Sequence, residues 1–239
     1  MSVRSSVVWI LLGITAFLVA CSGQKAASAP TPQPAADLGL ARKGLSPSEV
    51  DLPCTQVEAA SSFKVVSCRV FRHMGETVHL VGEIQNSGET AAANIEIKAV
   101  GTSAEGEVMD VKSGQVYLAP VPPGQRSPFR IFFDARDVAK VELTVTGQAT
   151  DALPPASLEV TNVAISAPSS GYTHITGNVN NPGPEVSAAT FIAVLRDGDG
   201  EVVEVHREKL LKPIPAGAST FDVLALHHGA KTAEVTILP

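Results

Sequence analysis

The sequence predicts an all-β protein with two tandem antiparallel β-sandwich domains, which follow a cleaved signal peptide and a disordered tether. Short segments of alternating apolar and polar residues are separated by clusters of Gly, Pro, Asn and Asp, as is typical of β-sandwiches. No long segment with helical spacing competes with them. The pattern also occurs twice, over residues 62–147 and 156–239, which indicates a duplicated domain.

Residues 1–20 have the composition of a signal peptide. Arg4 supplies a positive charge, and an apolar run from Val7 to Ala20 is interrupted by Gly13 and Thr15. The run is short for a transmembrane helix, which needs about 20 predominantly apolar residues. A single-helix anchor that is never cleaved is the alternative interpretation.

The segment Leu18-Val19-Ala20-Cys21 resembles the lipobox of bacterial lipoproteins. The resemblance implies that Cys21 is the first mature residue and the site of lipidation, so that acyl chains on it bind the lipid bilayer. Several chains, at about 0.8 kcal/mol per buried methylene, hold a protein stably at a membrane. We therefore expect an extracytoplasmic protein that is lipid-anchored to the cell envelope membrane. The same resemblance implies that Ser22 favours the outer membrane if the host is Gram-negative.

The predicted mature chain is acidic. Loss of Arg4 with residues 1–20 leaves 17 of the 18 basic residues against 24 acidic ones. Such a surface repels phosphate backbones, which argues against nucleic acid as a partner. The single Trp, Trp9, leaves with the signal peptide, so no aromatic platform for bases or sugars is evident.

Residues 21–45 are expected to form a lipidated flexible tether, because they are rich in Ala, Ser, Pro and Gln and cannot bury enough apolar surface to become ordered. Residues 46–61 are expected to be an irregular lead-in to the first domain. Within them, Ser46 could cap one short helical turn that has Pro47 at its first position.

Cys54 and Cys68 remain once Cys21 is assigned to lipid. An extracytoplasmic compartment permits a disulfide between them, which is the interpretation that we favour. The alternative is a buried thiol at Cys68 with an exposed Cys54. A zinc site has less support, since no second pair of Cys or His stands at ligand spacing nearby.

The internal repeat has two landmarks. Residues 81–88 align with residues 176–183, so that Gly82, a branched apolar residue, Asn86 and Gly88 recur 95 positions later. A Pro-rich turn at 120–124, followed by Phe129, matches the turn at 213–217, followed by Phe221. Two matched landmarks indicate duplication.

The strands expected in the first copy show apolar residues at every second position: Ile95, Ile97 and Ala99; Phe129, Ile131 and Phe133, flanking Arg130; and Val141, Leu143 and Val145. The second copy repeats the plan with Ile175, Gly177 and Val179, with Phe221, Val223 and Ala225, and with Val235 and Ile237. Its segment 190–195 is apolar on both faces. This predicts a covered sheet, which we favour, or a surface that packs on the other domain or on a partner.

The repeated unit, over residues 62–239, resembles the FxLYD-type domains of prokaryotic exported proteins. The elements shared are a Gly-x-Val/Ile-x-Asn-x-Gly strand and turn, a strand ending in Asp-x-x-Gly, and a Pro-rich turn before a Phe-led strand. The second copy has Ala193-Val194-Leu195-Arg196-Asp197 in place of the eponymous motif. The resemblance implies an immunoglobulin-like fold for both domains.

Histidines are the main candidates for a ligand site. His79 and His174 occupy equivalent positions, and period-two counting places them on the outward face of each sheet. Duplication of a surface residue explains this without a function. His227 and His228 are adjacent and would point to opposite faces of a strand, so a metal site there would need His206 or another donor.

Segment 197–200 predicts a hairpin turn. Asp197, Asp199 and Glu201 could instead be read as calcium ligands, but the further oxygen donors of a calcium loop are missing. The chain has neither a Gly-x-Ser-x-Gly element nor a phosphate-binding glycine loop before a helix. We therefore expect no enzyme activity, no catalytic residues, no cofactor and no bound metal.

These observations favour a non-enzymatic adaptor, which binds another envelope protein through its sheet edges. The alternative is an envelope protein that binds a metal or small ligand through surface histidines. A third possibility is a purely structural spacer.

Overall fold

The computed structural model describes residues 52, 54–57, 62–73, 77–166, 171–226 and 228–239, and all regular secondary structure within them is β-strand. Every described residue belongs to one compact unit of the chain. The expected signal peptide, Cys21 and the tether lie outside the described residues. Within those residues, no helix is long and apolar enough to cross a membrane.

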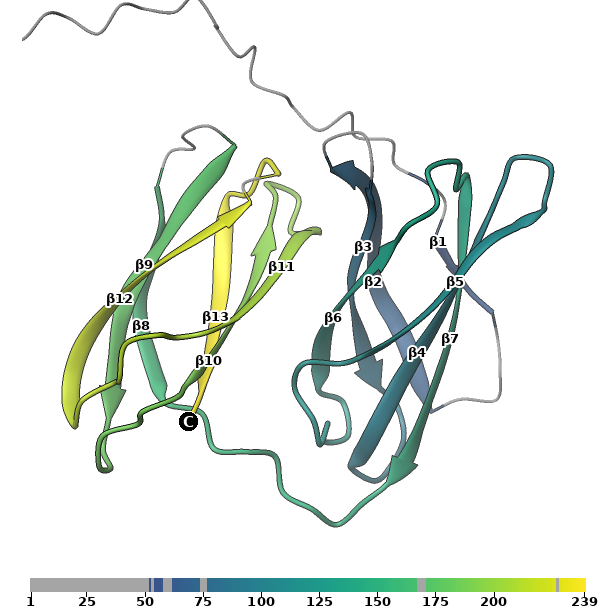
Figure 1. The fold of residues 1–239 in the computed structure, drawn as a ribbon. Helices are drawn as coiled ribbons and strands as arrows, with labels where there is room; N and C mark the ends of the chain where they lie inside the picture. Colours follow the sequence, from purple (N-terminus) through teal and green to yellow (C-terminus); the bar gives the residue numbers. More distant parts are fainter. Residues whose placement is uncertain (1–51, 53, 58–61, 74–76, 167–170, 227) are drawn as a thin grey trace, which may run out of the picture. The chain divides into compact units, whose positions relative to one another are not determined.

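The first sandwich consists of two sheets (Figure 1). One sheet has the order β2-β3-β6 and is antiparallel, and the other has the order β1-β7-β4-β5. The strands are β1 (Cys54–Gln56), β2 (Phe63–His73), β3 (Thr77–Asn86), β4 (Ala92–Thr102), β5 (Val108–Gln115), β6 (Arg126–Phe133) and β7 (Lys140–Ala149). Strand β7 thus ends two residues beyond the predicted end of the first domain.

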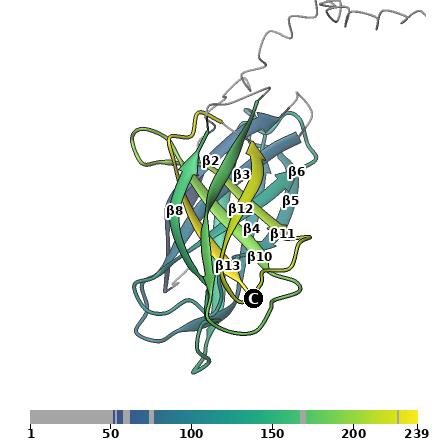
Figure 2. The same ribbon diagram turned by 90° about the vertical axis from the view of Figure 1, so that its left-hand side faces the viewer.

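The second sandwich repeats this plan. Its sheets have the orders β12-β9-β8 and β11-β10-β13, and the first of these faces the viewer in Figure 2. The strands are β8 (Glu159–Ile165), β9 (Tyr172–Asn181), β10 (Thr190–Arg196), β11 (Val202–Lys209), β12 (Gly217–Leu226) and β13 (Thr232–Leu238). Strands β2 to β7 therefore correspond in order to β8 to β13. The predicted fold class, two tandem immunoglobulin-like antiparallel sandwiches, is confirmed.

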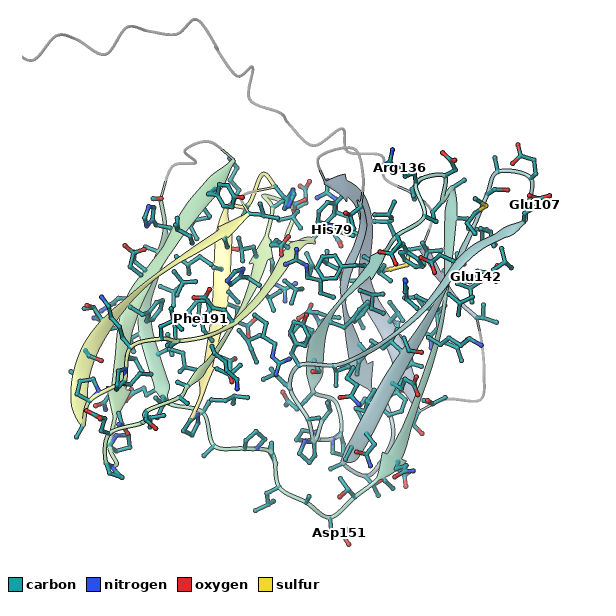
Figure 3. The ribbon with its side chains drawn as sticks, in the orientation of Figure 1. His79, Glu107, Arg136, Glu142, Asp151 and Phe191 are labelled. Carbon is teal, nitrogen blue, oxygen red and sulfur yellow. A yellow bond between two sulfur atoms is a disulfide. The ribbon has the colours of Figure 1, made fainter. Side chains whose placement is uncertain are left out.

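Alternation places the cores where the sequence predicts them. In β4, Ile95, Ile97 and Ala99 are buried, and the intervening Asn94, Glu96 and Lys98 are exposed. In the second sandwich, Phe191 lies between the two sheets (Figure 3), and its ring centroid is 5.5 Å from that of Phe221. A segment in which apolar and polar residues alternate thus forms a strand with one buried face, because successive side chains point to opposite faces of the sheet.

The repeated glycine and the repeated phenylalanine are direct cross-strand neighbours. Gly82 of β3 pairs with Phe129 of β6, and Gly177 of β9 pairs with Phe221 of β12. A Cβ atom at Gly82 would lie 2.8 Å from the Phe129 ring and 2.2 Å from the Ser67 carbonyl oxygen. The phenylalanine ring covers the glycine and leaves no room for a side chain there, which explains why the two residues recur together.

The repeated asparagine joins the same landmarks through hydrogen bonds. Asn86 is buried, and its Nδ2 donates to the carbonyl oxygen of Val121 at 2.8 Å, within the Pro-rich turn. Its Oδ1 accepts from the N–H of Gly88 at 2.9 Å. Asn181 makes the equivalent bonds, to the carbonyl of Ile214 at 3.4 Å and from the N–H of Gly183 at 3.0 Å. Each Asn-x-Gly turn is therefore hydrogen-bonded to the Pro-rich segment that connects the two sheets of its sandwich.

The expectation of an irregular lead-in over residues 46–61 is wrong for Cys54–Gln56, which forms β1. This strand pairs parallel to β7, and the side chain of Gln56 donates to the Phe63 carbonyl at 2.8 Å and accepts from the Val65 N–H at 2.8 Å. Three residues are too few to show alternation, and the partner strand lies far along the chain. Sequence pattern could not reveal this pairing.

Candidate functional site

An apolar cluster joins the two sandwiches. Its buried members are Phe71 and Val81 from the first sandwich and Val194, Val202 and Val205 from the second, with Tyr117 packed against them. Val194 lies on the outer face of β10, whose inner face fills the core of the second sandwich. Our preference for a sheet covered within its own domain is therefore wrong, because the cover comes from the other sandwich.

Arg130 and Glu204 form an ion pair within this contact. The Nη1 group of Arg130 in β6 donates to Oε1 of Glu204 in β11 at 2.7 Å and lies 3.4 Å from the Val205 carbonyl oxygen. The side chain of Glu204 has no exposed surface, and that of Arg130 is 15% exposed. A carboxylate is stable in such a place only when a cation and hydrogen-bond donors accompany it.

A second ion pair runs in the opposite direction. The Nη2 group of Arg196 in β10 donates to both carboxylate oxygens of Glu83 in β3, at 2.9 Å each. Arg126 approaches the same carboxylate at 3.8 Å, and Arg69 lies 3.8 Å from Asp197. Each sandwich thus supplies both a cation and an anion. The two ion pairs attract the sandwiches to each other. Because their polarities are opposite, they also favour one relative position of the two sandwiches.

His79 lies inside the contact, contrary to the prediction that it sits on an outward surface. It does face away from the core of its own sandwich, on β3 (Figure 3), but the second sandwich covers it and leaves it 4% exposed. Its Nδ1 lies 3.2 Å from Nη2 of Arg130. A guanidinium only donates, so Nδ1 accepts this hydrogen bond. Period-two counting gives the face of a sheet and carries no information on what covers that face.

Burial has the largest effect on the pKa values of the ionisable groups Glu204 and His206 in the contact. It raises the pKa of Glu204 to about 7, although Arg130 and the Val205 N–H act to lower it. His228, at φ 40°, places its Nε2 3.4 Å from Oε2 of Glu204. Burial also lowers the pKa of His206, whose Nε2 lies 3.4 Å from Glu208.

The remaining histidines are dispersed. His174 is exposed and its Nδ1 lies 2.6 Å from Oδ1 of Asp222, while His227 lies outside the described residues. Among the residues that the structure describes, no group of three or more His, Cys, Asp or Glu side chains could hold a metal ion. His79 and His228 pack against the same Phe71 ring, at centroid distances of 5.2 and 4.3 Å, whereas His174 pairs with Asp222.

The segment read alternatively as a calcium loop forms the predicted hairpin turn. The carboxylate of Asp197 accepts hydrogen bonds from the main-chain N–H groups of Asp199 and Glu201, each at 3.0 Å. Gly200 adopts a φ of 85°, which favours glycine. This geometry explains the Asp-Gly-Asp-Gly sequence as a turn between β10 and β11.

Cys54 and Cys68 are joined by a disulfide, with their Cα atoms 6.1 Å apart. The bond connects β1 to β2 and hence one sheet of the first sandwich to the other. Cys21, the predicted lipidation site, lies outside the described residues.

A cleft of about 280 Å³ lies beside the pair formed by Glu83 and Arg196. Arg126 and Glu234 complete its charged lining. Both arginines lie against the Glu83 carboxylate, so the charges of this region compensate one another. The chemistry of the site is therefore that of a docking contact, in which charged groups are used to hold two domains together.

Sequence reasoning did not identify Arg130, Glu204, Glu83 or Arg196 as site residues. One signal was available, because Glu204 interrupts the apolar run Val202-Val203-Glu204-Val205. A charge in a strand that is otherwise buried indicates a paired group, but the sequence does not indicate with which residue it pairs.

Neither a family model nor a curated protein matches the chain. Among solved structures, the crystal structure of red sea bream transglutaminase is similar over 73% of this chain and 29% of its own, with 12% identity and a TM-score of 0.21. The chain thus spans less than a third of the length of that transglutaminase. A likeness at this score carries no argument about fold or function.

Proposed function

We propose that this chain is a membrane-anchored bacterial envelope lipoprotein that acts as a non-enzymatic adaptor for another envelope protein. The observation that carries the proposal is the charged contact between the sandwiches, built on Arg130 with Glu204 and Glu83 with Arg196. A pair of domains locked in this way offers its outer strands as one preorganised surface, which lowers the entropy cost of binding.

The stability of the contact between the sandwiches follows from the burial of its charged groups. Removing one partner of a buried ion pair costs about 3–5 kcal/mol, because the other charge is then left in an apolar environment. The apolar residues Phe71, Val81 and Val205 add hydrophobic attraction. The segment between β7 and β8 is exposed at Pro154 and Pro155, so the contact depends on the side chains of the two sandwiches.

Strand β5 supplies a binding edge. It ends its sheet, and Val108, Met109 and Val111 are 63%, 38% and 47% exposed. Edge strands accept an added strand from a partner, and apolar side chains beside them strengthen such contacts. The lipobox-like segment 18–21 supports a location at the membrane, where an adaptor would meet envelope proteins.

The test is affinity purification of the full-length chain from membranes of its own host after gentle crosslinking, with bound proteins identified by mass spectrometry. A Cys21→Ser chain serves as the control for anchoring. The variant Arg130→Glu places two carboxylates together and separates the sandwiches, while the double variant Arg130→Glu with Glu204→Arg restores opposite charges.

An adaptor predicts one reproducible partner, which is lost with Cys21→Ser, weakened with Arg130→Glu and recovered in the double variant. Absence of any reproducible envelope protein from the wild-type sample would overturn the proposal. Retention of the same partner by Arg130→Glu at wild-type yield would show that the locked pair of sandwiches does not carry the binding.

A further inference from the structure

His79 and His174 hold equivalent positions in the two repeats, but they meet opposite charges. His79 lies on β3, and its Nδ1 is 3.2 Å from the Nη2 group of Arg130 on β6. His174 lies on β9, and its Nδ1 is 2.6 Å from the Oδ1 atom of Asp222 on β12. Their exposure also differs, since His79 is 4% exposed and the side chain of His174 is 49% exposed. We therefore expect the two imidazoles to respond to acid in opposite ways.

An added proton would break the hydrogen bond between His79 and Arg130. Because Nδ1 accepts this bond, the neutral imidazole carries its hydrogen on Nε2, and a second proton can go only to Nδ1. Two N–H donors and two positive charges would then face each other across 3.2 Å in a buried place. Like charges repel most strongly where water is largely excluded. The closed contact thus favours the neutral form of His79.

The burial of His79 depends on the contact between the sandwiches. Its side chain faces away from the core of its own sandwich (Figure 3), and the second sandwich covers it. Its neighbour Arg130 is bonded at the same time to Glu204 of the second sandwich. When the sandwiches separate, His79 enters water, where an imidazole takes up a proton near its ordinary pKa of about 6.5. Separation is therefore coupled to the uptake of a proton.

We infer that the contact between the sandwiches is an acid-sensitive switch, in which the uptake of a proton by His79 separates them. The neutral imidazole contributes to the closed contact above about pH 6.5, and this contribution is lost as the pH falls further. The inference adds regulation to the contact on which the proposed adaptor rests. Its tests measure the contact itself without a partner, so either proposal can fail without the other.

Glu204 and His228 form the second titratable pair of the contact. Burial raises the pKa of Glu204 to about 7, so its carboxyl alone would favour the closed contact in acid. His228 belongs to the same sandwich, and its Nε2 lies 3.4 Å from Oε2 of Glu204. In acid the pair holds one proton in both states, on the carboxyl when buried and on the imidazole in water. The pair therefore leaves the direction of the response to the other histidines.

The remaining ionisable groups near His79 do not reverse this direction. Burial lowers the pKa of His206, so this residue also disfavours the closed contact in acid. Burial raises the pKa of Tyr117, and the guanidinium of Arg207, 5.1 Å from its ring, stays charged, so neither changes its charge near neutral pH. On the same strand as His79, Glu83 is held by Arg196 at 2.9 Å.

The first experiment measures opening in the full-length chain by the rate at which methyl methanethiosulfonate labels an introduced thiol. Val194→Cys places the thiol in the apolar cluster between the sandwiches, where Val194 is 6% exposed. Leu211→Cys places it at a residue that is 97% exposed. The ratio of the first rate to the second removes the effect of pH on the thiol itself. Peptide mass spectrometry reads the label at each cysteine separately.

We expect this labelling ratio to rise at least about tenfold from pH 7.5 to pH 5.5, because one extra proton in the open state changes its population tenfold per pH unit below about 6.5. His79→Gln should reduce the rise by about tenfold, since an amide oxygen accepts the Arg130 hydrogen bond at every pH. His174→Gln is the matched control and should respond like the wild type. A constant ratio in the wild type, or an equal rise in His79→Gln, would overturn the inference.

The second experiment makes the positive charge at position 79 permanent. In His79→Lys an ammonium group faces Arg130 at every pH, so we expect a labelling ratio at pH 7.5 at least about tenfold above that of the wild type. His174→Lys places the same charge beside Asp222 and should leave the ratio unchanged. Circular dichroism checks that both variants keep their β-structure. A wild-type ratio in a folded His79→Lys chain would contradict the switch.

Discussion

The guanidinium of Arg130 lies 2.7 Å from the carboxylate of Glu204, a residue 74 positions later that has no exposed surface. This pair connects two sandwiches whose folds are otherwise complete, since each has its own apolar core. A charge that is buried only when the sandwiches meet makes their contact selective and sensitive to pH.

The pH dependence of stability follows from Glu204. Its pKa in the folded protein is about 7, above the ordinary value of 4.5, so the folded state holds the proton more tightly. The resulting stabilisation is complete below pH 4.5 and is lost as the pH rises through 7. We expect the wild type to lose on the order of 3 kcal/mol relative to Glu204→Gln over this range. Urea unfolding at several pH values measures the difference.

The Glu204→Gln comparison removes the contribution of other groups. Burial lowers the pKa of His206, so this residue has the opposite effect: its contribution is present above the ordinary pKa of 6.5 and declines as the pH falls. His206 is present in both proteins and cancels in their difference. Parallel stability curves for the two proteins would contradict the assignment to Glu204.

The two repeated glycines should differ in their tolerance of a methyl group. A Cβ at Gly82 would lie 2.2 Å from the Ser67 carbonyl oxygen, whereas at Gly177 the nearest main-chain atom is the Thr161 carbonyl oxygen at 3.2 Å. We expect Gly82→Ala to destabilise by about 2–4 kcal/mol and Gly177→Ala by less, because the Phe221 ring can shift. Gly198→Ala is the control, since no atom lies within 4 Å of its Cβ position. Urea midpoints that rank Gly177→Ala as the more damaging change would contradict this.

Asn86 should be required for stability. Its Nδ2 donates to the carbonyls of Val121 and Thr90, both at 2.8 Å. We expect Asn86→Ala to cost about 2–4 kcal/mol, because it leaves buried carbonyl groups without a donor. Asn86→Asp should cost more at pH 8, since a carboxylate would face these oxygens. Thermal unfolding measures both.

The exposed Asn178 provides the control for that series, because Asn178→Ala should change stability by no more than about 0.5 kcal/mol. Asn181→Ala should be milder than Asn86→Ala, since two of its Nδ2 contacts are longer, at 3.2 and 3.4 Å. Equal losses at all three positions would indicate that the hydrogen bonds are not the cause.

The disulfide should stabilise the first sandwich. It closes a loop between residues 14 positions apart, for which loop entropy predicts about 3 kcal/mol. We expect the double variant Cys54→Ser with Cys68→Ser to lose this amount and to lose hydrogen-exchange protection in β1. Reductant should reproduce the loss in the wild type and leave the double variant unchanged. A wild type that is insensitive to reductant would contradict the prediction.

Much of the fold was predictable from local pattern. Alternation at Ile95, Ile97 and Ala99 identified a half-buried strand, and the recurrence of Asn86 at Asn181 revealed the duplication. The alternation of a strand can be recognised locally, because it is complete within a few consecutive residues. Strand β1 was not predicted, because three residues are too few to show an alternating pattern and its partner β7 is remote in sequence.

The candidate site was hidden for a related reason. His79 was placed correctly relative to its own sheet, yet its burial depends on a strand more than a hundred residues later. The sequence by itself determined the fold class, the repeat and the face on which each strand residue lies, since these follow from short-range periodicity. Only the tertiary structure decided which outer faces meet and which charges pair, because those contacts arise between segments that no local pattern connects.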